Sequence, residues 1–544
     1  MQNLFTRLEE NATRQPDKAA FVFADSSGHW QSVTFRQVFE RSQSLARGLA
    51  TYNISPGTRA VLMIAPSVEF FALVFALLKL GIVLVLIDPG IGLRNVTLCL
   101  AEAKPEIYLG SPLTHGLRML FGWGKSSLHL NLSLSDIQRA AQKQPSNVQP
   151  PAIRPDAEMA VIFTSGSTGL PKGAVYTIAN FAAQIAMLED ILHLHGDEVD
   201  LPAFPIFALI DCLLGITAVV PDMRFPRPAR VDPRRIIAAI QTQRVDTIFA
   251  SPVVLARLAR YGREHSATLP SLQRIITAGA PAPVAVLEEF RQMLNDEAEV
   301  WGVYGSTETL PVALVNGRDI LNETRYLSAQ GAGVCIGRPV AGADVRIIRI
   351  DDGPFPAWDN ALRLPDGQIG EIAVKGAAVT GEYAGKAAYN KLAKIRDADG
   401  QVIHRMGDLG YFDGQGRLWY CGRKSHRVVV DGELLCTETV EGVFNDHPQV
   451  YRSALVGVER AGRVEPVLWV ELEPSTHSTK KDRRDKDRLD KDRLRAELLA
   501  LAANNPVSHS IRTILFHSNF PTDIRHNSKI IREKLARQAQ RKLT

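Results

Sequence analysis

The residues best suited to chemistry lie in one glycine-rich stretch, Thr164–Gly173. Its glycines let the backbone approach a ligand closely and turn several N–H groups toward it. The side chains that can bind an anion are those of Thr164, Ser165, Thr168 and Lys172. This combination predicts a cradle for a polyphosphate, with a flexible surface loop rich in serine and glycine as the alternative.

The residues beside this stretch narrow the type of loop. Met159–Phe163 is an apolar run typical of a buried strand, so the loop is expected to follow a strand directly. Pro171 stands where a GxxxxGK[ST] loop requires its second glycine, which excludes a Walker A loop. We therefore expect a phosphate cradle of another type.

Four further motifs follow in the chain and offer complementary groups. Ala278–Pro281 is a small-residue turn against which a flat ring could lie. Tyr304–Glu308 supplies an aromatic face, hydroxyls and a carboxylate. An acid at the end of a strand comes from Met406–Tyr411, and an arginine follows in Gly422-Arg423. A lysine near the C-terminus comes from Asn527–Ile530.

The carboxylates of these motifs suit two different tasks. Glu308 is a natural ligand for Mg²⁺ that bridges phosphates, because hard cations prefer oxygen. Asp408 is suited to holding ribose hydroxyls. Each residue alone has an ordinary explanation: a surface carboxylate for Glu308, a turn residue for Asp408 and a tail lysine for Lys529. The order of all five motifs together favours a nucleotide site.

The pattern of apolar residues predicts an α/β protein. We interpret the apolar run Phe70–Asp88 as a helix over Val68–Leu80 and a strand over Ile82–Ile87 rather than as a membrane helix. The alternation of strands and helices continues through residues 160–350. Other expected elements are helices over Phe35–Leu49, capped by Thr34, and Leu93–Ala103, and strands within Val245–Pro252 and Leu272–Pro281.

Two domains are expected. Residues 1–423 form a large N-terminal domain of layered α/β sheets, and residues 424–544 a small mobile C-terminal α+β domain. A charged insertion at about 476–495 is expected to be a solvated helix or a disordered segment, with a docking patch as the alternative. The small domain is expected to contain strands at Val428–Asp431, Ala454–Val458 and Val464–Leu472 and a helix at Glu438–Asn445.

Charge and cysteine content argue against several other classes of protein. Of the net charge of +5, residues 480–495 contribute most, with nine basic and five acidic residues, so the rest of the chain does not indicate nucleic-acid binding. The five cysteines form no CxxC pair, which argues against zinc or disulfides and favours the cytoplasm. The first residues do not form a signal peptide.

Met119–Gly124 is an apolar segment expected in a longer loop, either as part of the core or as a surface for a lipid-like substrate or a partner.

On its five motifs, nearly the whole chain resembles the adenylate-forming superfamily of acyl-CoA synthetases, adenylation domains and luciferases. The resemblance implies ATP and Mg²⁺ as cofactors and a lysine, Lys529, that bridges the substrate carboxylate and the α-phosphate. Thr164 and Glu308 are implied as metal ligands and join Lys529 as catalytic residues. The implied nucleotide-binding residues are Thr164, Ser165, Gly166, Ser167, Thr168, Gly169, Lys172, Gly279, Ala280, Pro281, Tyr304, Gly305, Ser306, Thr307, Asp408, Arg423 and Lys529.

Three departures from the superfamily pattern concern the acyl pocket and the hinge. Ala208 stands where many members have a histidine near the acyl group, and Ser425 stands where the hinge usually has Asp or Lys. Glu438 and Glu441 surround Thr439 in place of the usual pattern, so a thioester-forming conformation is less expected than an adenylating one. The walls of the acyl pocket are expected to be Phe204, Phe207, Ala208, Trp301, Gly302 and Val303.

Within the superfamily, the chain is similar to the β-lactone synthetases of bacterial long-chain olefin biosynthesis. The similarity is carried by Phe204–Leu209, Ile87–Gly92, His404–Asp408 and Leu418–Val428. It implies a long-chain 2-alkyl-3-hydroxy acid substrate, activation by ATP to an acyl-AMP, and attack by the 3-hydroxyl to close a β-lactone. It also implies assembly with other enzymes of the hydrocarbon pathway and permits peripheral membrane contact.

Other functions remain open at this point. A long-chain fatty-acyl-CoA ligase would need CoA for turnover, and an acyl-AMP ligase would load a carrier protein. A non-catalytic nucleotide-binding scaffold is disfavoured because Lys172, Glu308 and Lys529 are all present. RNA binding by the charged segment is weaker still, because the segment lacks interleaved aromatic residues and contains acids.

Overall fold

The computed structural model of the chain describes residues 4–25, 28–143, 148–164, 171–223, 225, 227–460, 462–473, 483–522 and 529–543. For Pro89, Thr164 and residues 483–489, side chains are not described. The predicted contacts of residues 165–170 and the Asn527-Ser528 part of the last motif therefore lie outside the described residues.

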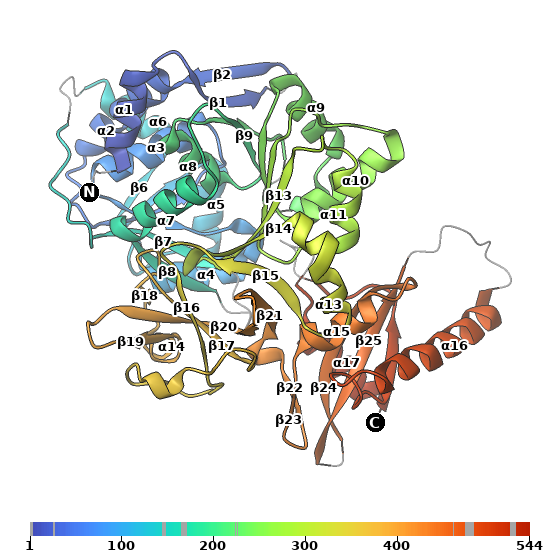
Figure 1. Cartoon of the computed structure of the whole chain (residues 1–544). Coiled ribbons are helices and arrows are strands. Elements are labelled where there is room, and N and C mark those ends of the chain that lie inside the picture. The colour runs from blue at the N-terminus through green and yellow to red at the C-terminus, as the bar shows by residue number, and fades with distance from the viewer. Residues whose placement is uncertain are drawn as a thin grey trace.

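Two sheets form the large part of the molecule, as predicted for an α/β fold (Figure 1). The smaller has seven strands, mostly parallel, and ends in the β7–β8 hairpin and the short strand β18. Its order is β18 (Glu382–Tyr383), β8 (Lys172–Thr177), β7 (Glu158–Thr164), β4 (Val83–Leu86), β3 (Arg59–Met63), β5 (Ile107–Gly110) and β6 (Leu130–Leu132).

The larger sheet has fourteen strands, parallel at its centre and antiparallel from β14 to β16. Its order is β16 (Asp344–Ile348), β17 (Gly370–Lys375), β20 (Val402–Phe412), β21 (Leu418–Arg423), β15 (Val334–Pro339), β14 (Thr309–Asn316), β13 (Glu299–Ser306), β12 (Arg274–Ala278), β11 (Thr247–Ala250), β9 (Val199–Pro202), β10 (Thr217–Val220), β1 (Ala19–Ala24) and β2 (Trp30–Thr34), with β19 (Lys394–Arg396) paired to β20.

Helices bury one face of each sheet in a common core. The largest apolar cluster joins residues of both sheets to helices α1 (Leu4–Arg14), α2 (Phe35–Ala50), α3 (Val68–Lys79), α7 (Ile178–Ile191) and α8 (Pro205–Leu214). The other helices of the large part are α4 (Leu93–Ala103), α5 (Pro112–Phe121), α6 (Leu134–Ala141), α9 (Pro233–Gln243), α10 (Pro252–His265), α11 (Val284–Arg291), α12 (Gly317–Asp319), α13 (Arg325–Ala329) and α14 (Ala387–Ala393).

Local signals in the sequence predicted several of these elements well. The Thr34 side chain accepts from the Gln37 backbone N–H while the Gln37 side chain accepts from Thr34, a capping box that starts α2 as expected. The apolar run over residues 70–88 is α3 followed by β4, and no helix among the described residues is long and apolar enough to cross a membrane.

The segment Met119–Gly124 differs from the expected loop. Residues 119–121 end helix α5, because Ser111 caps its first turn, Pro112 occupies the first helical position and Gly122 adopts the left-handed conformation at its end. The segment is divided between the core and the surface, and its role as a surface for a substrate or a partner stays a prediction. Trp123 is buried in the core, whereas Met119 and Leu120 are exposed.

The C-terminal part forms a separate three-stranded sheet with its own core. Strands β24 (Val450–Arg460), β25 (Arg463–Leu472) and β26 (Thr513–His517) pack against α15 (Thr437–Asn445), α16 (Arg483–Ala503) and α17 (Arg532–Leu543), beside the hairpin β22 (Val428–Val430) and β23 (Glu433–Leu435). The predicted domain boundary at residue 423 falls where β21 passes into the turn Lys424–His426, and it stays a prediction.

The charged segment is more than a solvated insertion. From residue 483 it forms α16, whose first half projects to the side of the small sheet (Figure 1). The second half of this helix buries Leu494, Leu498 and Ala502 in the small-domain core. The charged run at residues 480–495 therefore overlaps the first half of a structural helix.

Candidate active site

The predicted phosphate loop joins the two strands of a hairpin. Thr164 ends β7 and pairs directly with Lys172, which starts β8. The Lys172 ammonium lies 4.2 Å from the ring centroid of Tyr389. Burial lowers the pKa of Lys172, and the negative charge of Glu308 opposes that shift. The ammonium therefore lies near enough to Glu308, the predicted metal ligand, for the two charges to interact.

A second wall of the site comes from two adjacent parallel strands. Ala278 at the end of β12 pairs with Val303 on β13, so the Gly279–Pro281 turn and the Tyr304 ring follow neighbouring strand ends. Gly279 has a φ of +94°, a conformation that a side chain would strain. Ligands of such sheets bind outside the carboxyl ends of the strands, as the sequence predicted for this turn.

Tyr304, Asp408 and Arg423 form a connected polar cluster. The Tyr304 hydroxyl donates to Asp408 Oδ2 at 2.7 Å, and Arg423 Nη1 lies 3.0 Å from Asp408 Oδ1. Asp408 and Arg423 are direct partners on the antiparallel strands β20 and β21. Burial raises the pKa of Asp408, whereas Arg423, Tyr304 and Lys529 favour its ionised form.

Glu308 lies at the junction of the two sheets. Its carboxylate accepts a 2.5 Å hydrogen bond from the Tyr383 hydroxyl on β18, and its carbonyl accepts from the Thr380 backbone N–H. The neighbouring Thr307 carbonyl accepts from the Tyr176 hydroxyl on β8. These contacts bring the 304–308 motif next to the strand that leaves the phosphate loop.

The charges around Glu308 keep it ionised. Burial alone would raise its pKa, but the Tyr383 hydrogen bond and the positive charge of Lys394 hold it below its usual value. Burial, together with Lys394, lowers the pKa of His404 to about 3, so the imidazole is neutral at neutral pH. Burial lowers the pKa of Lys394 to about 7 against the attraction of Glu308.

Tyr383, Lys394 and His404 were not among the predicted site residues. His404 lies on β20 four residues before Asp408, and the pairing of β20 with β17 shifts register between the two residues. Its only signal in the sequence was its position just before the Gly407-Asp408 motif. Tyr383 and Lys394 come from short strands whose pairing the local sequence does not specify.

The C-terminal part meets the site through Lys529. This exposed lysine lies close enough to Asp408 to lower the pKa of the aspartate. The turn after Arg423 contains Ser425, and its Lys424 ammonium contacts Glu371 Oε2 of the large sheet at 3.0 Å. A charged contact is therefore present one residue before Ser425, and the role of this turn as a hinge stays a prediction.

Glu441, one of the carboxylates noted in the small domain, has a structural partner. Arg532 donates to its two carboxylate oxygens at 2.6 and 2.9 Å, and Glu438 lies 3.9 Å from the same guanidinium. Burial raises the pKa of Glu441 to about 7 despite this pairing. The pair links α15 to the start of α17, three residues after Lys529.

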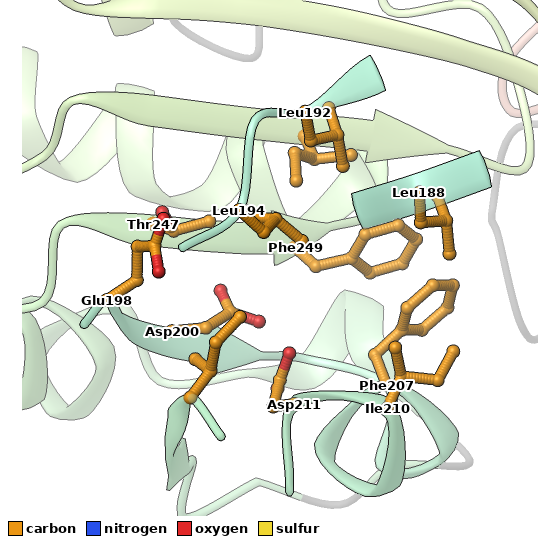
Figure 2. A pocket seen from close by; sticks show the side chains of 12 residues that line it. Leu188, Leu192, Leu194, Glu198, Asp200, Phe207, Ile210, Asp211, Thr247 and Phe249 are labelled. Carbon is orange, nitrogen blue, oxygen red and sulfur yellow. The ribbon is translucent and has the colours of Figure 1, made fainter. Parts of the chain in front are cut away.

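Three of the residues predicted to form the acyl pocket, Phe207, Ala208 and Val303, pack into the same apolar cluster. Phe207 stacks on Phe249 with 3.6 Å between ring centroids, and both line a small cavity between α7, α8 and the large sheet (Figure 2). Ala208 is buried in the main core. Trp301 donates its indole N–H to Glu299 on the same strand. Phe204 precedes α8, Gly302 lies on β13 and Val303 is buried beside them.

The cavity beneath Phe207 contains an unexpected pair of acids. Asp200 and Asp211 both point into it, and each has one carboxylate oxygen that no described residue reaches with a hydrogen bond (Figure 2). Burial raises the pKa of Asp200 to about 7, and burial and Asp200 raise that of Asp211 well above its usual range. Because the two buried carboxyl groups interact with each other, they share one proton at neutral pH.

Comparison with known proteins identifies the family. The pattern of the AMP-binding enzyme family matches residues 8–384. The chain is 41% identical over 554 aligned positions to the olefin beta-lactone synthetase of Xanthomonas campestris pv. campestris, covering 98% of this chain and 97% of that protein. The chain belongs to the AMP-binding enzymes, in the branch of the olefin beta-lactone synthetases.

Further relatives agree with this assignment. The olefin beta-lactone synthetase of Stenotrophomonas maltophilia is 43% identical over 557 positions, covering 98% of this chain and 97% of the relative. Among solved structures, the o-succinylbenzoate CoA synthetase of Bacillus subtilis has a TM-score of 0.75 at 21% identity, with 98% of both chains covered. The amide bond synthetase of Marinactinospora thermotolerans has a TM-score of 0.78 at 21% identity, with 98% of this chain and 99% of that chain covered. These structures establish the adenylate-forming fold.

The polar groups of this AMP-binding enzyme fit a nucleotide. Asp408 Oδ1 is buried, and Arg423 Nη1 lies 3.0 Å from it as an ion pair without an aligned hydrogen bond, so this oxygen can still accept one from a ribose hydroxyl. The Tyr304 ring, whose hydroxyl contacts Asp408, supplies a flat face next to this carboxylate. Glu308 is the ionised oxygen donor that Mg²⁺ prefers.

Proposed function

We propose that the protein uses ATP to activate a long-chain 2-alkyl-3-hydroxy acid as an acyl-AMP and then closes the acyl group to a β-lactone. AMP and pyrophosphate are the other products. The full-length identity of 41–43% to olefin beta-lactone synthetases carries this proposal. The Tyr304–Asp408–Arg423 cluster, linked by charge to Lys529, supports the nucleotide half of the reaction.

The first step joins two anions, and the proposed roles follow from that difficulty. A substrate carboxylate oxygen attacks the α-phosphorus, and the bond from that phosphorus to the pyrophosphate oxygen breaks. In this proposal Lys529 neutralises the approaching carboxylate and α-phosphate. Residues 164–172 hold the outer phosphates, and Asp408 fixes the ribose.

A divalent metal fits the same site. Among the described residues no cluster of three or more His, Cys, Asp or Glu side chains could hold a metal ion by itself. We therefore propose that Glu308, with Thr164, shares Mg²⁺ with the phosphates, as Mg²⁺ sites with few protein ligands do. When bound, the metal offsets negative charge on the phosphate oxygens.

The second step needs no second substrate. The 3-hydroxyl oxygen attacks the activated acyl carbon, the bond from that carbon to the AMP oxygen breaks, and AMP leaves as the hydroxyl proton is lost. The attacking group is already attached to the acyl chain, so holding the chain in one conformation raises its effective molarity greatly. Ala208, in place of a histidine, leaves the wall of the proposed acyl pocket apolar.

The deciding experiment is product analysis without CoA. Purified protein, ATP, Mg²⁺ and a synthetic long-chain 2-alkyl-3-hydroxy acid are incubated, and proton NMR is used to find the ring protons of a β-lactone together with accumulating AMP. A matched acid that lacks the 3-hydroxyl should form at most one acyl-AMP per protein. AMP formation that depends on CoA, with a thioester product, would overturn the proposal in favour of an acyl-CoA ligase.

We also propose that the protein works in the cytoplasm and assembles with other enzymes of the same hydrocarbon pathway. The charged first half of α16 is one candidate surface. Deleting residues 480–495 would remove the buried Leu494, so the sharper test replaces the charges of residues 480–488 with serine. Unchanged co-purification of pathway enzymes would exclude this surface.

A further inference from the structure

Helix α5 presents an outer face without any polar side chain. Its exposed residues are Pro112, Leu113, Gly116, Met119, Leu120 and Phe121. Leu113 is 73% exposed, Met119 69% and Leu120 74%, whereas Leu117 turns inward and packs against the core. This is the reverse of an ordinary surface helix, which directs its apolar residues toward the protein.

The neighbouring helix α4 carries two more exposed leucines. Both helices cover the same core cluster on the face of the seven-stranded sheet that α1–α3 do not cover. The Trp123 indole N–H, just after α5, donates to the Thr97 hydroxyl on α4 at 3.0 Å. Of eleven large apolar side chains exposed among the described residues, six belong to these two helices, namely Leu93, Leu98, Leu113, Met119, Leu120 and Phe121. We call these six residues the α4–α5 patch.

The segment that contains α5 carries only basic charged residues. From Ser111 to Leu132 the chain contains no acidic residue, while Arg118 and Lys125 flank the exposed end of α5. The Arg118 guanidinium is held over the Tyr108 ring at 5.6 Å, and Lys125 is exposed. Cations beside an inserted apolar helix are attracted to anionic lipid headgroups.

We propose that the α4–α5 patch docks the protein on the surface of an anionic lipid bilayer. A convex helix with a wholly apolar outer face and cations at its edge matches an interfacial helix, which buries its apolar side in the headgroup region. A protein partner would instead have to supply a matching groove. The inference also explains access to a water-insoluble substrate, and in that respect it rests on the proposed long-chain substrate.

Vesicle sedimentation tests the docking without relying on turnover. The whole protein is mixed at low salt with vesicles of phosphatidylcholine and phosphatidylglycerol in equal parts, and separately with phosphatidylcholine alone. Wild-type protein is expected to sediment with the anionic vesicles. The double variant Leu113→Asp/Leu120→Asp should lose at least tenfold in partitioning, because both charges would enter the lipid. Lys125→Glu should weaken binding to the anionic vesicles only.

A matched control separates docking from general loss of apolar surface. Tyr451 is also an exposed apolar side chain, 52% exposed, but lies on β24, and Tyr451→Asp should sediment like wild type. Unchanged circular dichroism and pyrophosphate release with a short soluble hydroxy acid would show that the double variant is folded. Wild-type protein that binds neither vesicle, or a double variant that binds as well as wild type, would overturn the proposal whatever the reaction product proves to be.

Discussion

Tyr304 donates a 2.7 Å hydrogen bond to Asp408 across 104 residues of sequence, and this contact joins two of the motifs that point to a nucleotide. Arg423 approaches the other oxygen of the same carboxylate. The aspartate is therefore fixed from both sides before a ribose arrives. Its position depends on the strand order of the large sheet, in which β15 and β14 lie between β21 and β13, and no local pattern specifies that order.

Tyr304→Phe is expected to weaken ATP binding. The phenol hydrogen bond to a carboxylate contributes on the order of 1.5–3 kcal/mol, so the KM for ATP should rise about tenfold while the ring face remains. The measurement is pyrophosphate release at varied ATP. Tyr326→Phe, on a 58% exposed tyrosine, is the control. An unchanged KM for ATP in Tyr304→Phe would argue against a role of the contact in binding.

Lys529→Ala should abolish most of the adenylation without unfolding the protein. The lysine is exposed, so it contributes little to packing. Its positive charge, which comes from the small domain, lowers the pKa of Asp408. We expect pyrophosphate release to fall at least a hundredfold, as for the loss of one strong electrostatic contact. Lys534→Ala, on an exposed lysine of α17, is the matched control. Normal pyrophosphate release from Lys529→Ala would remove this residue from the mechanism.

Glu308→Gln should raise the Mg²⁺ requirement. Because surrounding groups hold the pKa of Glu308 below its usual value, the wild-type residue is charged throughout the working pH range. Loss of that charge should increase the Mg²⁺ concentration for half-maximal pyrophosphate release at least tenfold. Glu323→Gln, at an exposed carboxylate paired with Arg417, should not change it. The same Mg²⁺ dependence in Glu308→Gln and wild type would exclude Glu308 as the metal ligand.

The buried acids of the cavity predict a stability that depends on pH. An unfolded aspartate loses its proton near pH 4, whereas folded Asp200 keeps it to about pH 7. The folded state therefore binds more protons between these values, and stability falls as pH rises from about 4 to 7.

Asp211→Asn should remove much of that dependence, because the amide can donate to Asp200 without ionising. Its Tm is expected to exceed that of wild type at pH 8, by an amount corresponding to about 2–4 kcal/mol, and to differ less at pH 4. Thermal unfolding at both pH values measures this. Asp222→Asn, on an exposed carboxylate, is the control. Parallel pH profiles for Asp211→Asn and wild type would contradict the shared proton.

The sequence by itself determined many of the helices and strands and the types of chemical group that the site can use. The Thr34 capping box, the apolar runs around residues 61–87 and the two strands near residues 250 and 278 formed as expected, because capping and side-chain periodicity act over a few residues. The five motifs also predicted the family, which the comparisons confirmed. The contacts of residues 165–170 lie outside the described residues, and the roles of the other site residues stay predictions.

Only the tertiary structure decided which groups face one another. Tyr383 and Lys394 reach Glu308 from strands of two or three residues, whose pairing comes from the sheets around them. The same packing buried His404 near Glu308 and left the outer face of α5 uncovered. Long-range pairing and burial set these relations, and both depend on residues far apart in the chain, so local sequence patterns do not contain them.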